Sequence, residues 1–302
     1  MSACDDFTVV IPVRDEVEAI GPVLEELLAV GVDRDRIIVV DGWSSDGTRE
    51  VASSYGVKVV NQLYPGGKAG GLRTGFELVE TSSVIVMDGD YTYPAGHIWD
   101  LCKALDRGYD MVIGVRNPEP GAMNPIFKFG NRVLTLWFNL VFGTKLRDVL
   151  SGMYAIKLEA LKGLLWEAGG FSVESELVAH IASTTGRIGE VDIAYRRRKG
   201  RKKLGVAGGL RIALDMIRLS FSYNPIFTLF SIASLILIPG LALDAYYLYH
   251  LVFSDVKYYM KGLLGAIMTI VGLQTLTTAI LALYMKRMEF RLRRAIEEAL
   301  RR

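Results

Sequence analysis

Two carboxylates, one residue apart, end an apolar segment of this chain. Residues 84–87 read Val-Ile-Val-Met and are followed by Asp88, Gly89 and Asp90. Such an apolar run predicts a buried strand, and open α/β sheets bind ligands at the carboxyl ends of their strands. Carboxylate oxygens at that place suit Mg²⁺ or Mn²⁺ holding the diphosphate of a nucleotide. An acidic turn without a ligand would use the same residue types, so the rest of the chain must decide.

Two further polar clusters follow predicted strands. A strand at residues 7–13 ends at Arg14-Asp15-Glu16, and a strand at 36–40 ends at residues 41–48, Asp-Gly-Trp-Ser-Ser-Asp-Gly-Thr. Because the carboxyl ends of parallel strands lie at one edge of a sheet, we expect the three clusters to converge. Their convergence favours a nucleotide pocket over three unrelated turns.

Strand and helix patterns alternate through the first part of the chain. Beyond the two strands above, strands are expected at 57–61, 83–87 and 111–115, and helices at 17–30, 48–55 and 69–80. This order predicts an α/β domain with a mostly parallel, doubly wound sheet. Residues 122–142 and 208–223 have amphipathic patterns that predict helices at a membrane interface, with packing on the sheet as the alternative for the first.

The last third of the chain is strongly apolar. The whole chain is 51% apolar with a mean hydropathy of +0.28, and residues 219–243 and 262–285 contain no charged side chain. Each run could cross a membrane as a helix, which favours a transmembrane hairpin over two buried core helices. The expected organisation is a domain at 1–204, an interfacial helix at 205–223, two transmembrane helices within 224–285 (about 224–250 and 262–285) and a basic tail at 286–302.

Charge distribution predicts the orientation of this hairpin. Basic residues flank the two apolar runs at their outer ends: Arg211, Arg218, Lys286, Arg287, Arg291, Arg293 and Arg294. The positive-inside rule therefore places the first 220 residues and the tail in the cytoplasm. Asp244 and a tyrosine-rich segment between the runs are expected at the far interface. Gln274, Thr275, Thr277 and Thr278 offer hydrogen bonds to another helix, so a homo-oligomer is an open expectation.

The cysteines and the N-terminus agree with a cytoplasmic location. Cys4 and Cys102 have no spacing typical of a disulfide framework or a metal site, so free thiols in a reducing compartment are expected. Residues 1–6 are short and acidic, and no signal peptide is expected. Residues 196–203 contain seven basic side chains in eight, but without interleaved aromatic residues they do not predict nucleic-acid binding. Anionic lipid is the simpler partner for them.

Eight segments, taken in order, carry a family resemblance: Ile11 to Glu16, Val40 to Thr48, Gly67 to Phe76, Met87 to Asp90, Gly114 to Asn117, Asp148 to Gly152, Phe171 to Glu176 and Tyr195 to Leu204. These motifs resemble those of the family 2 glycosyltransferases with the GT-A fold. The longer set is similar to the dolichol-phosphate and polyprenyl-phosphate mannosyltransferases and glucosyltransferases. The resemblance covers about the first 205 residues.

The resemblance implies an enzyme that transfers a hexose, with inversion and with Mg²⁺ or Mn²⁺. The donor would be GDP-mannose or UDP-glucose, with mannose favoured, and the acceptor a dolichyl or polyprenyl phosphate in the membrane. The first alternative is a membrane glycosyltransferase that extends a lipid-linked oligosaccharide or a polysaccharide, which would need a carboxylate base. The second is a membrane protein that senses nucleotide sugars or scaffolds partners without catalysis.

Site residues follow from these motifs. The metal ligands are expected to be Asp88 and Asp90. The donor would contact Pro12, Arg14, Glu16, Asp41, Lys68 and Gly89 as well as the two aspartates. An anionic acceptor phosphate calls for cations, and the candidates are Arg116, Lys128, Arg132 and Arg198, with Ser151 as a further contact of the acceptor. Asp88, Asp90, Arg116 and Arg198 are the expected catalytic residues.

Four positions qualify this interpretation. Gly42 stands where the family usually has a second adjacent aspartate, and Thr92 stands where it often has a glutamine that joins the metal shell. The paired Glu174 and Glu176 could lie near the sugar, with Glu176 the better candidate, although such pairs are usually on the surface.

Overall fold

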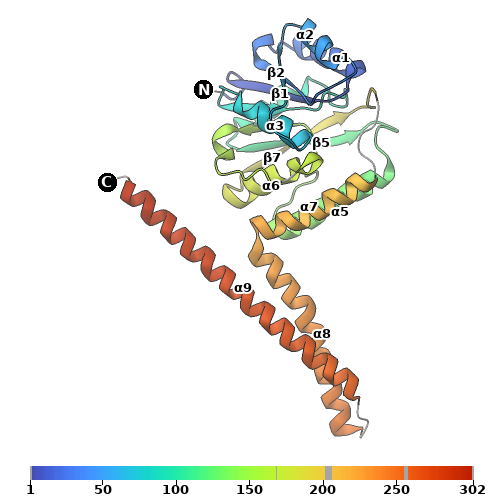
Figure 1. The fold of residues 1–302 in the computed structure, drawn as a ribbon, viewed down its shortest axis with the longest axis vertical. Helices are drawn as coiled ribbons and strands as arrows, with labels where there is room; N and C mark the ends of the chain where they lie inside the picture. The colour runs from blue at the N-terminus through green and yellow to red at the C-terminus, as the bar shows by residue number, and fades with distance from the viewer. Residues whose placement is uncertain (1, 168, 201–205, 255–257, 301–302) are drawn as a thin grey trace. The chain divides into compact units, whose positions relative to one another are not determined.

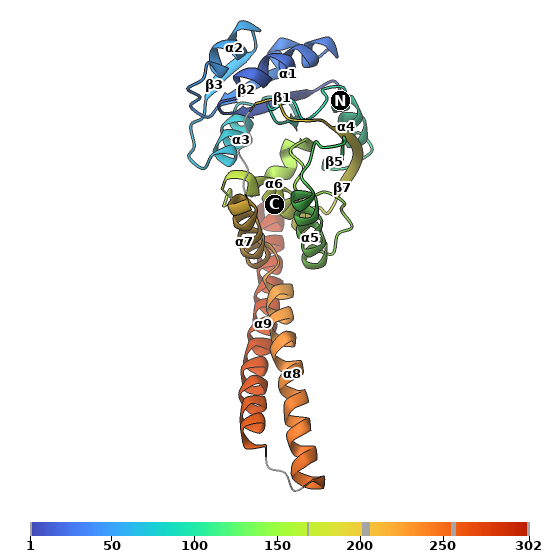
Figure 2. The ribbon, with the colours of Figure 1, turned by 90° about the vertical axis from the view of Figure 1, so that its right-hand side faces the viewer.

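A computed structural model describes residues 2–167, 169–200, 206–254 and 258–300, and the chain divides into two units, 1–219 and 220–302. The first unit is built on a seven-stranded sheet with strand order β3-β2-β1-β4-β6-β5-β7. Figures 1 and 2 show helices packed around this sheet. The strands are β1 (Phe7–Val13), β2 (Ile37–Asp41), β3 (Lys58–Asn61), β4 (Ser83–Val86), β5 (Met111–Pro118), β6 (Tyr154–Lys157) and β7 (Ile188–Tyr195). Every described pairing is parallel except the two made by β6. The mostly parallel α/β sheet is confirmed.

Helices cover both faces of this sheet. The helices that begin in the first unit are α1 (Val17–Ala29), α2 (Thr48–Ser54), α3 (Lys68–Glu77), α4 (His97–Leu105), α5 (Pro125–Phe142), α6 (Val173–Thr184) and α7 (Val206–Tyr223), and α2, α3, α4 and α6 contact strands of the sheet. Val9 and Ile11 of β1 share one core with side chains of α1 and α4. On the opposite face, Gly75 of α3 lies against Val10 and Val40 so closely that a side chain there would collide with them. Burial on both faces explains why the central strands read as continuous apolar runs.

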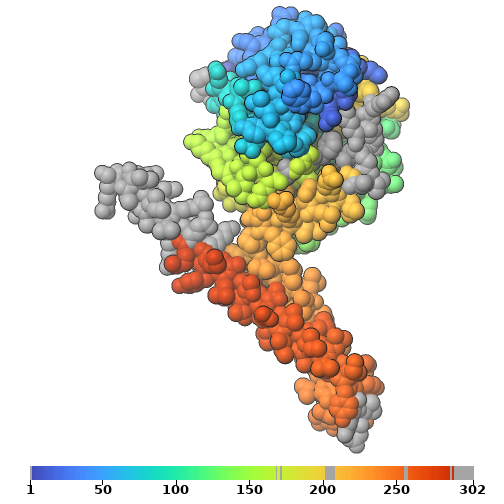
Figure 3. Space-filling model, viewed as in Figure 1, coloured from blue at the N-terminus to red at the C-terminus, as the bar shows by residue number. Residues whose placement is uncertain are grey.

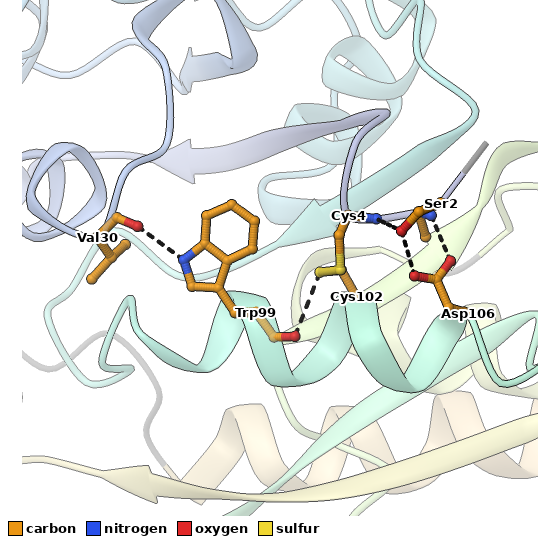
Figure 4. The surroundings of a disulfide bond; sticks show 7 residues. Ser2, Cys4, Val30, Trp99, Cys102 and Asp106 are labelled. Atoms are coloured by element: carbon orange, nitrogen blue, oxygen red, sulfur yellow. Dashed lines mark hydrogen bonds between the residues drawn. A yellow bond between two sulfur atoms is a disulfide. The ribbon is translucent and has the colours of Figure 1, made fainter.

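The expectation of free cysteines is wrong. Cys4 forms a disulfide with Cys102 of α4, across a separation of 98 residues (Figure 4). Ser2 Oγ donates a hydrogen bond to Asp106 of the same helix end, so the N-terminal segment is held to α4 by a covalent and a polar contact. The spacing of two cysteines in sequence carries no information on their distance in a doubly wound fold. The cysteines therefore do not support a reducing compartment.

Loss of the disulfide is expected to lower the free energy of unfolding of the first unit. Opening a loop of 98 residues gives the unfolded chain more freedom, with a typical cost of about 2–4 kcal/mol. Cys102→Ser should reproduce the effect of dithiothreitol in urea unfolding followed by circular dichroism. Reductant should then have no further effect on the variant. Equal midpoints for the oxidised and reduced protein would contradict the prediction.

The second unit contains two long apolar helices. They are α8 (Pro225–Phe253) and α9 (Tyr259–Leu300), which pack side by side (Figures 2 and 3). The most apolar windows of Pro225–Phe253 and Tyr259–Met285 have mean hydropathies of 2.3 and 1.9, so both helices are long and apolar enough to cross a membrane. Because α9 continues to Leu300, residues 286–300 extend this helix, where the sequence suggested a separate tail.

The hairpin contains a polar contact between its two helices at Asp244. Asp244, which we expected at the far interface, lies within α8 and accepts a hydrogen bond of 2.7 Å from Thr269 Oγ1 of α9. A polar side chain among apolar helices is stabilised by such a partner. Thr275, Thr277 and Thr278 donate their hydroxyls to carbonyl oxygens of α9 itself, four residues earlier. The homo-oligomer stays a prediction.

Candidate active site

The carboxyl ends of four neighbouring strands border one polar cavity. Its volume is about 240 Å³, and we call it the polar pocket. Its lining comes from the segments after β1, β2, β3 and β4, from the start of α3 and from two later loops: Pro12, Val13, Arg14, Glu16, Gly42, Gln62, Gly67, Lys68, Asp88, Gly89, Asp90, Gly170 and Arg198. The convergence expected from the strand order is therefore present.

The two aspartates after β4 lie at one end of this pocket. Asp90 is buried. Thr92 donates two hydrogen bonds to Asp90 Oδ1, one from its hydroxyl at 2.5 Å and one from its backbone N–H at 3.1 Å. Thr92 therefore orients Asp90 through hydrogen bonds. Gly152 approaches the carboxylate of Asp88 so closely that any side chain at position 152 would overlap it.

Lys68, at the start of α3, lies between two carboxylates. Its Nζ is 2.5 Å from Asp88 Oδ1, and it also pairs with Glu174 in the first turn of α6. Burial alone would lower the pKa of Lys68, but the charges of Asp88 and Glu174 outweigh it and raise the pKa well above its usual range. Lys68 is therefore a fixed ammonium ion within the site.

Arg198 makes a similar bridge on the other side. It pairs with Glu16 after β1, and its Nη1 is 3.2 Å from Asp90 Oδ2. The ion pairs described in this cluster join four carboxylates, those of Glu16, Asp88, Asp90 and Glu174, to the cations Lys68 and Arg198. Burial and the nearby charge of Asp88 raise the pKa of Asp90, and burial raises the pKa of Glu174 against the opposing effect of Lys68. Burial and crowding of carboxylates therefore disfavour the ionised forms of Asp90 and Glu174.

The paired aspartates fit a divalent cation. Among the described residues no three His, Cys, Asp or Glu side chains are arranged to hold a metal by themselves. Asp88 and Asp90 would supply two hard oxygen ligands, and a bound diphosphate would supply others. A divalent ion would also lower the cost of ionising Asp90, whose pKa the charge of Asp88 raises.

Arg198 is positioned by the segment around it. The backbone N–H groups of Arg196 and Lys199 donate to the carbonyl oxygens of Thr92 and Asp90, at 2.8 and 3.2 Å. The Arg196 guanidinium also makes two hydrogen bonds to Glu26, at 2.7 and 2.9 Å. These contacts hold residues 196–199, which we call the basic loop, directly against the two aspartates.

Tyr91 is the platform on which the basic loop packs. The guanidinium carbon of Arg196 and the ammonium of Lys199 each lie 3.9 Å from the centre of its ring. Tyr91 has a φ of 69°, a left-handed conformation that non-glycine residues seldom adopt. The two cations on one ring stabilise this conformation by cation–π attraction.

A second, larger cavity opens from the same cluster. It has a volume of about 490 Å³, and we call it the apolar groove. Helices α5 and α7 supply most of its apolar side chains, Ile126, Phe127, Phe129, Val133, Leu134, Leu210, Ile212 and Ala213. Lys68, Asp88, Asp90 and Arg198 line both this groove and the polar pocket. The charged cluster is therefore the junction between a polar and an apolar cavity.

Arg116 also borders the groove, but its charge is already paired. Its Nε and Nη2 each donate a hydrogen bond of 2.7 Å to Asp148, and Asn131 of α5 donates to the same carboxylate at 3.0 Å. Because Asp148 accepts hydrogen bonds from both Arg116 of β5 and Asn131 of α5, its carboxylate connects the strand to the helix. Arg116 still presents a polar edge to the groove, so its contact with an acceptor phosphate stays a prediction.

Four predicted site residues do not line either cavity. The Asp41 carboxylate accepts hydrogen bonds from the backbone and hydroxyl of Ser44 and so shapes its own loop. Ser151 is buried, with its hydroxyl 3.5 Å from the carbonyl oxygen of Met153. Lys128 and Arg132 are exposed on α5, outside the described lining of the groove.

Glu174 and Gln62 also line the cavities. The sequence offered Glu174 only as the weaker candidate of a pair with Glu176, and it did not point to Gln62. Glu174 is buried against Lys68, whereas Glu176 accepts a hydrogen bond of 2.7 Å from the backbone of Glu167 and does not line the cavities. Gln62 follows β3, whose end carried no acidic cluster. A polar residue directly after each strand was the signal that could have found Gln62.

Comparison with known families decides the class of this fold. Residues 8–162, more than half of the chain, match the family model described as glycosyl transferase family 2. The chain belongs to this family. It is therefore a glycosyltransferase.

Curated relatives of this glycosyltransferase extend the comparison. Glycosyltransferase AglJ of Haloferax volcanii is 29% identical over 93% of this chain and 94% of its own length. The dolichyl-phosphate hexose transferase of the same organism is 31% identical over 71% of this chain and 93% of its length. The dolichol-phosphate mannosyltransferase of Pyrococcus furiosus is 28% identical over 65% of this chain and 58% of its length.

Solved structures agree on the fold. Glucosyl-3-phosphoglycerate synthase from Mycobacterium tuberculosis, crystallised with Mn²⁺, UDP-glucose and phosphoglyceric acid, superposes with a TM-score of 0.60. The match covers 72% of this chain and 79% of that chain at 24% identity. The GT-A architecture expected from the resemblance is thus confirmed for this glycosyltransferase.

Removal of the Tyr91 ring is expected to slow sugar transfer. Tyr91→Leu keeps an apolar side chain but loses both cation–π contacts, so the basic loop should hold Arg198 less firmly, and kcat/KM should fall about tenfold. Tyr91→Phe keeps the ring and should change kcat/KM much less. Steady-state transfer assays on both variants check the prediction, and equal losses in the two would contradict it.

Proposed function

We propose that this enzyme transfers a hexose, with inversion, from a nucleotide diphosphate sugar to a dolichyl or polyprenyl phosphate. One observation carries the proposal. A polar pocket of about 240 Å³ and an apolar groove of about 490 Å³ meet at Lys68, Asp88, Asp90 and Arg198. A reaction between a soluble nucleotide sugar and a lipid phosphate needs such a junction, because its two substrates differ strongly in polarity.

The polar pocket is the proposed donor site. Asp88 and Asp90 would hold Mg²⁺ or Mn²⁺ against the diphosphate, and the bound ion would neutralise charge that develops on the leaving group. Lys68 and Arg198 face the same place and would contact phosphate oxygens. Glu16 and Arg14 also line this pocket. The donor would be GDP-mannose or UDP-glucose, and mannose is favoured because the Pyrococcus relative is named a mannosyltransferase.

The apolar groove is the proposed acceptor site. The side chains of α5 and α7 would contact the first isoprene units of the lipid, and its phosphate would lie near Arg198 and the edge of Arg116. A phosphate is already ionised at neutral pH, so it can attack without a dedicated base. The names of two curated relatives, which transfer to dolichyl phosphate, support this acceptor.

The arrangement of the cavities suggests the stereochemistry. An acceptor oxygen in the groove would approach the anomeric carbon from one side, and the nucleoside diphosphate would leave into the polar pocket on the other. Displacement with attack and departure on opposite sides inverts the anomeric centre. Lys68 and Arg198 line both cavities. Both cations would therefore stay close to the negative charge as that charge shifts from the acceptor phosphate to the leaving diphosphate.

Membrane attachment completes the proposal. Helix α5 exposes large apolar side chains that no described part of the chain covers: Ile126, Phe129, Val133, Leu136, Trp137 and Leu140. Such a surface suits the boundary between lipid head groups and acyl chains. We place the domain formed by residues 1–204, the interfacial helix and the C-terminal tail at the cytoplasmic face, with α8 and α9 as the spans.

Glu174 favours one alternative. A sugar hydroxyl, unlike a phosphate, must lose a proton as it attacks, and a buried carboxylate with a raised pKa at the groove could accept that proton. Extension of a lipid-linked oligosaccharide or polysaccharide is therefore the second candidate function. Glu174→Gln separates the two: transfer to a phosphate should survive the change in part, whereas transfer to a hydroxyl should be lost.

An acceptor panel tests the proposal. Purified enzyme in detergent receives Mn²⁺ and radiolabelled GDP-mannose or UDP-glucose, together with dolichyl phosphate, dolichol or a lipid-linked disaccharide. We expect labelled lipid with dolichyl phosphate and not with dolichol. Labelling of the disaccharide lipid in place of dolichyl phosphate would move chain extension to first place.

A further inference from the structure

Gln62 presents a fixed hydrogen-bond acceptor to the polar pocket. It follows β3 directly, and its backbone N–H donates to the carbonyl oxygen of Asp41 at 2.8 Å. Its side chain lines the pocket. This amide belongs neither to the metal cluster nor to the acceptor groove, so the proposed chemistry leaves it without a role.

Two glycines make room for this side chain. A Cβ atom at Gly70 would lie 2.6 Å from Gln62 Nε2, which is closer than real side chains approach. A Cβ atom at Gly42 would lie 3.2 Å from Gln62 Oε1, which is tighter than most side-chain contacts. Gly42 stands where a second aspartate was expected, and a larger side chain there would compete with the Gln62 amide for the same space.

Hydrogen bonding determines which way the amide points. Nε2 donates to the carbonyl oxygen of Tyr64 at 2.5 Å, and a carbonyl accepts only from the NH₂ end of an amide. Oε1 is therefore turned toward Gly42. Within the described part of the chain, no hydrogen bond to Oε1 is formed. The pocket thus contains an oriented oxygen that can accept one.

The sheet sets the spacing between the strands that lead to Gln62 and to the two aspartates. Gln62 follows β3, and Asp88 follows β4, which is three strands away in the order β3-β2-β1-β4. Three strand spacings amount to about 14 Å. A nucleoside diphosphate that binds its metal at Asp88 and Asp90 and extends along the strand ends would bring its base toward Gln62.

We propose that Gln62 Oε1 accepts a hydrogen bond from the ring N–H of the donor's base and so selects an oxo base. Uracil and guanine carry such an N–H beside a carbonyl on their pairing edge. Adenine and cytosine carry a bare acceptor nitrogen at that ring position, which would face Oε1 and repel it. The inference rests on the proposed function, because it assumes that the pocket binds a nucleotide sugar.

Binding of nucleotides tests this without turnover. The affinities of UDP, GDP, CDP and ADP for the full-length protein in detergent are measured by calorimetry with Mn²⁺. We expect UDP or GDP to bind at least about tenfold more tightly than CDP and ADP. Methylation of the ring nitrogen, as in N3-methyl-UDP or N1-methyl-GDP, should weaken binding of the preferred nucleotide by about tenfold in the wild-type protein.

Two variants address the residue itself. Gln62→Met keeps the length of the side chain but removes the acceptor, so it should bind the preferred nucleotide and its N-methyl analogue equally weakly. Gly42→Ala leaves Gln62 in place and displaces its oxygen, since the added Cβ would lie 3.2 Å from Oε1, and it should reduce the same preference. Thermal unfolding of both variants checks that the domain remains folded.

The outcomes separate this inference from the proposed function. Equal binding of all four nucleotides, or a preference that Gln62→Met retains, would overturn the role of Gln62 and leave the glycosyltransferase activity intact. No binding of any nucleoside diphosphate would overturn the proposed donor together with the inference. A preference for an oxo base that both N-methylation and Gln62→Met abolish would support it.

Discussion

Asp90→Asn should reduce sugar transfer by about a thousandfold or more. The variant keeps the shape of the side chain and its hydrogen bond from Thr92, but it removes one of two charged ligands for the divalent ion. Metal stabilisation of the leaving diphosphate contributes several kcal/mol, and each 1.36 kcal/mol is tenfold in rate. Initial rates with saturating Mn²⁺, and direct measurement of Mn²⁺ affinity, check the expectation.

The fold should tolerate this substitution. Burial and the charge of Asp88 raise the pKa of Asp90, so its ionised form is costly in the folded protein above that pKa, and the neutral amide removes this cost. Asp192→Asn, an exposed carboxylate on β7 that pairs with Arg147, is the matched control and should transfer sugar at the wild-type rate. Full activity of Asp90→Asn, or an equal loss in both variants, would contradict the assignment of Asp90 to the metal.

Lys68→Met is expected to destabilise the first unit by about 3–5 kcal/mol. The change leaves Asp88 and the buried Glu174 without their shared cation, and removing one partner from a buried ion pair typically costs this much. Urea unfolding measures the loss. Lys103→Met, an exposed lysine on α4, is the matched control and should change the free energy of unfolding little.

Glu174→Gln should compensate for the loss of Lys68. The double variant Lys68→Met with Glu174→Gln removes both partners of one buried pair, so it should be more stable than Lys68→Met alone. Mn²⁺ should also stabilise Lys68→Met more than the wild-type protein, because the lysine no longer competes for Asp88. Additive losses in the double variant would show that the two side chains do not interact.

The strand pattern was enough to predict where the site lies. β1, β2 and β4 are neighbours in one parallel sheet, so the residues after them had to meet at one edge, and Arg14, Glu16, Asp88 and Asp90 do line one pocket. The uninterrupted apolar runs at 219–243 and 262–285 likewise predicted α8 and α9. Both inferences rest on periodicity and on local order along the chain.

Contacts between distant segments could not be predicted in this way. Glu174 reaches Lys68 from a helix that begins 105 residues later, and the partner of Arg116, Asp148, lies 32 residues away. The Asp41 carboxylate forms its hydrogen bonds within its own loop, because the hydroxyl and the backbone N–H of Ser44 lie at hydrogen-bond distance. The role of each of these side chains depends on its hydrogen-bond or ion-pair partner. The residue type alone is compatible with several partners and does not identify which one is present.

The most direct test of the central claim is to identify the product of a single incubation. Wild-type enzyme, GDP-mannose or UDP-glucose, dolichyl phosphate and Mn²⁺ are combined, and the lipid fraction is analysed by mass spectrometry. We predict dolichyl phosphate that has gained one hexose, formed with release of the nucleoside diphosphate, absent with EDTA and absent with Asp90→Asn. Donor hydrolysis to free hexose, with unmodified dolichyl phosphate in every sample, would contradict the claim.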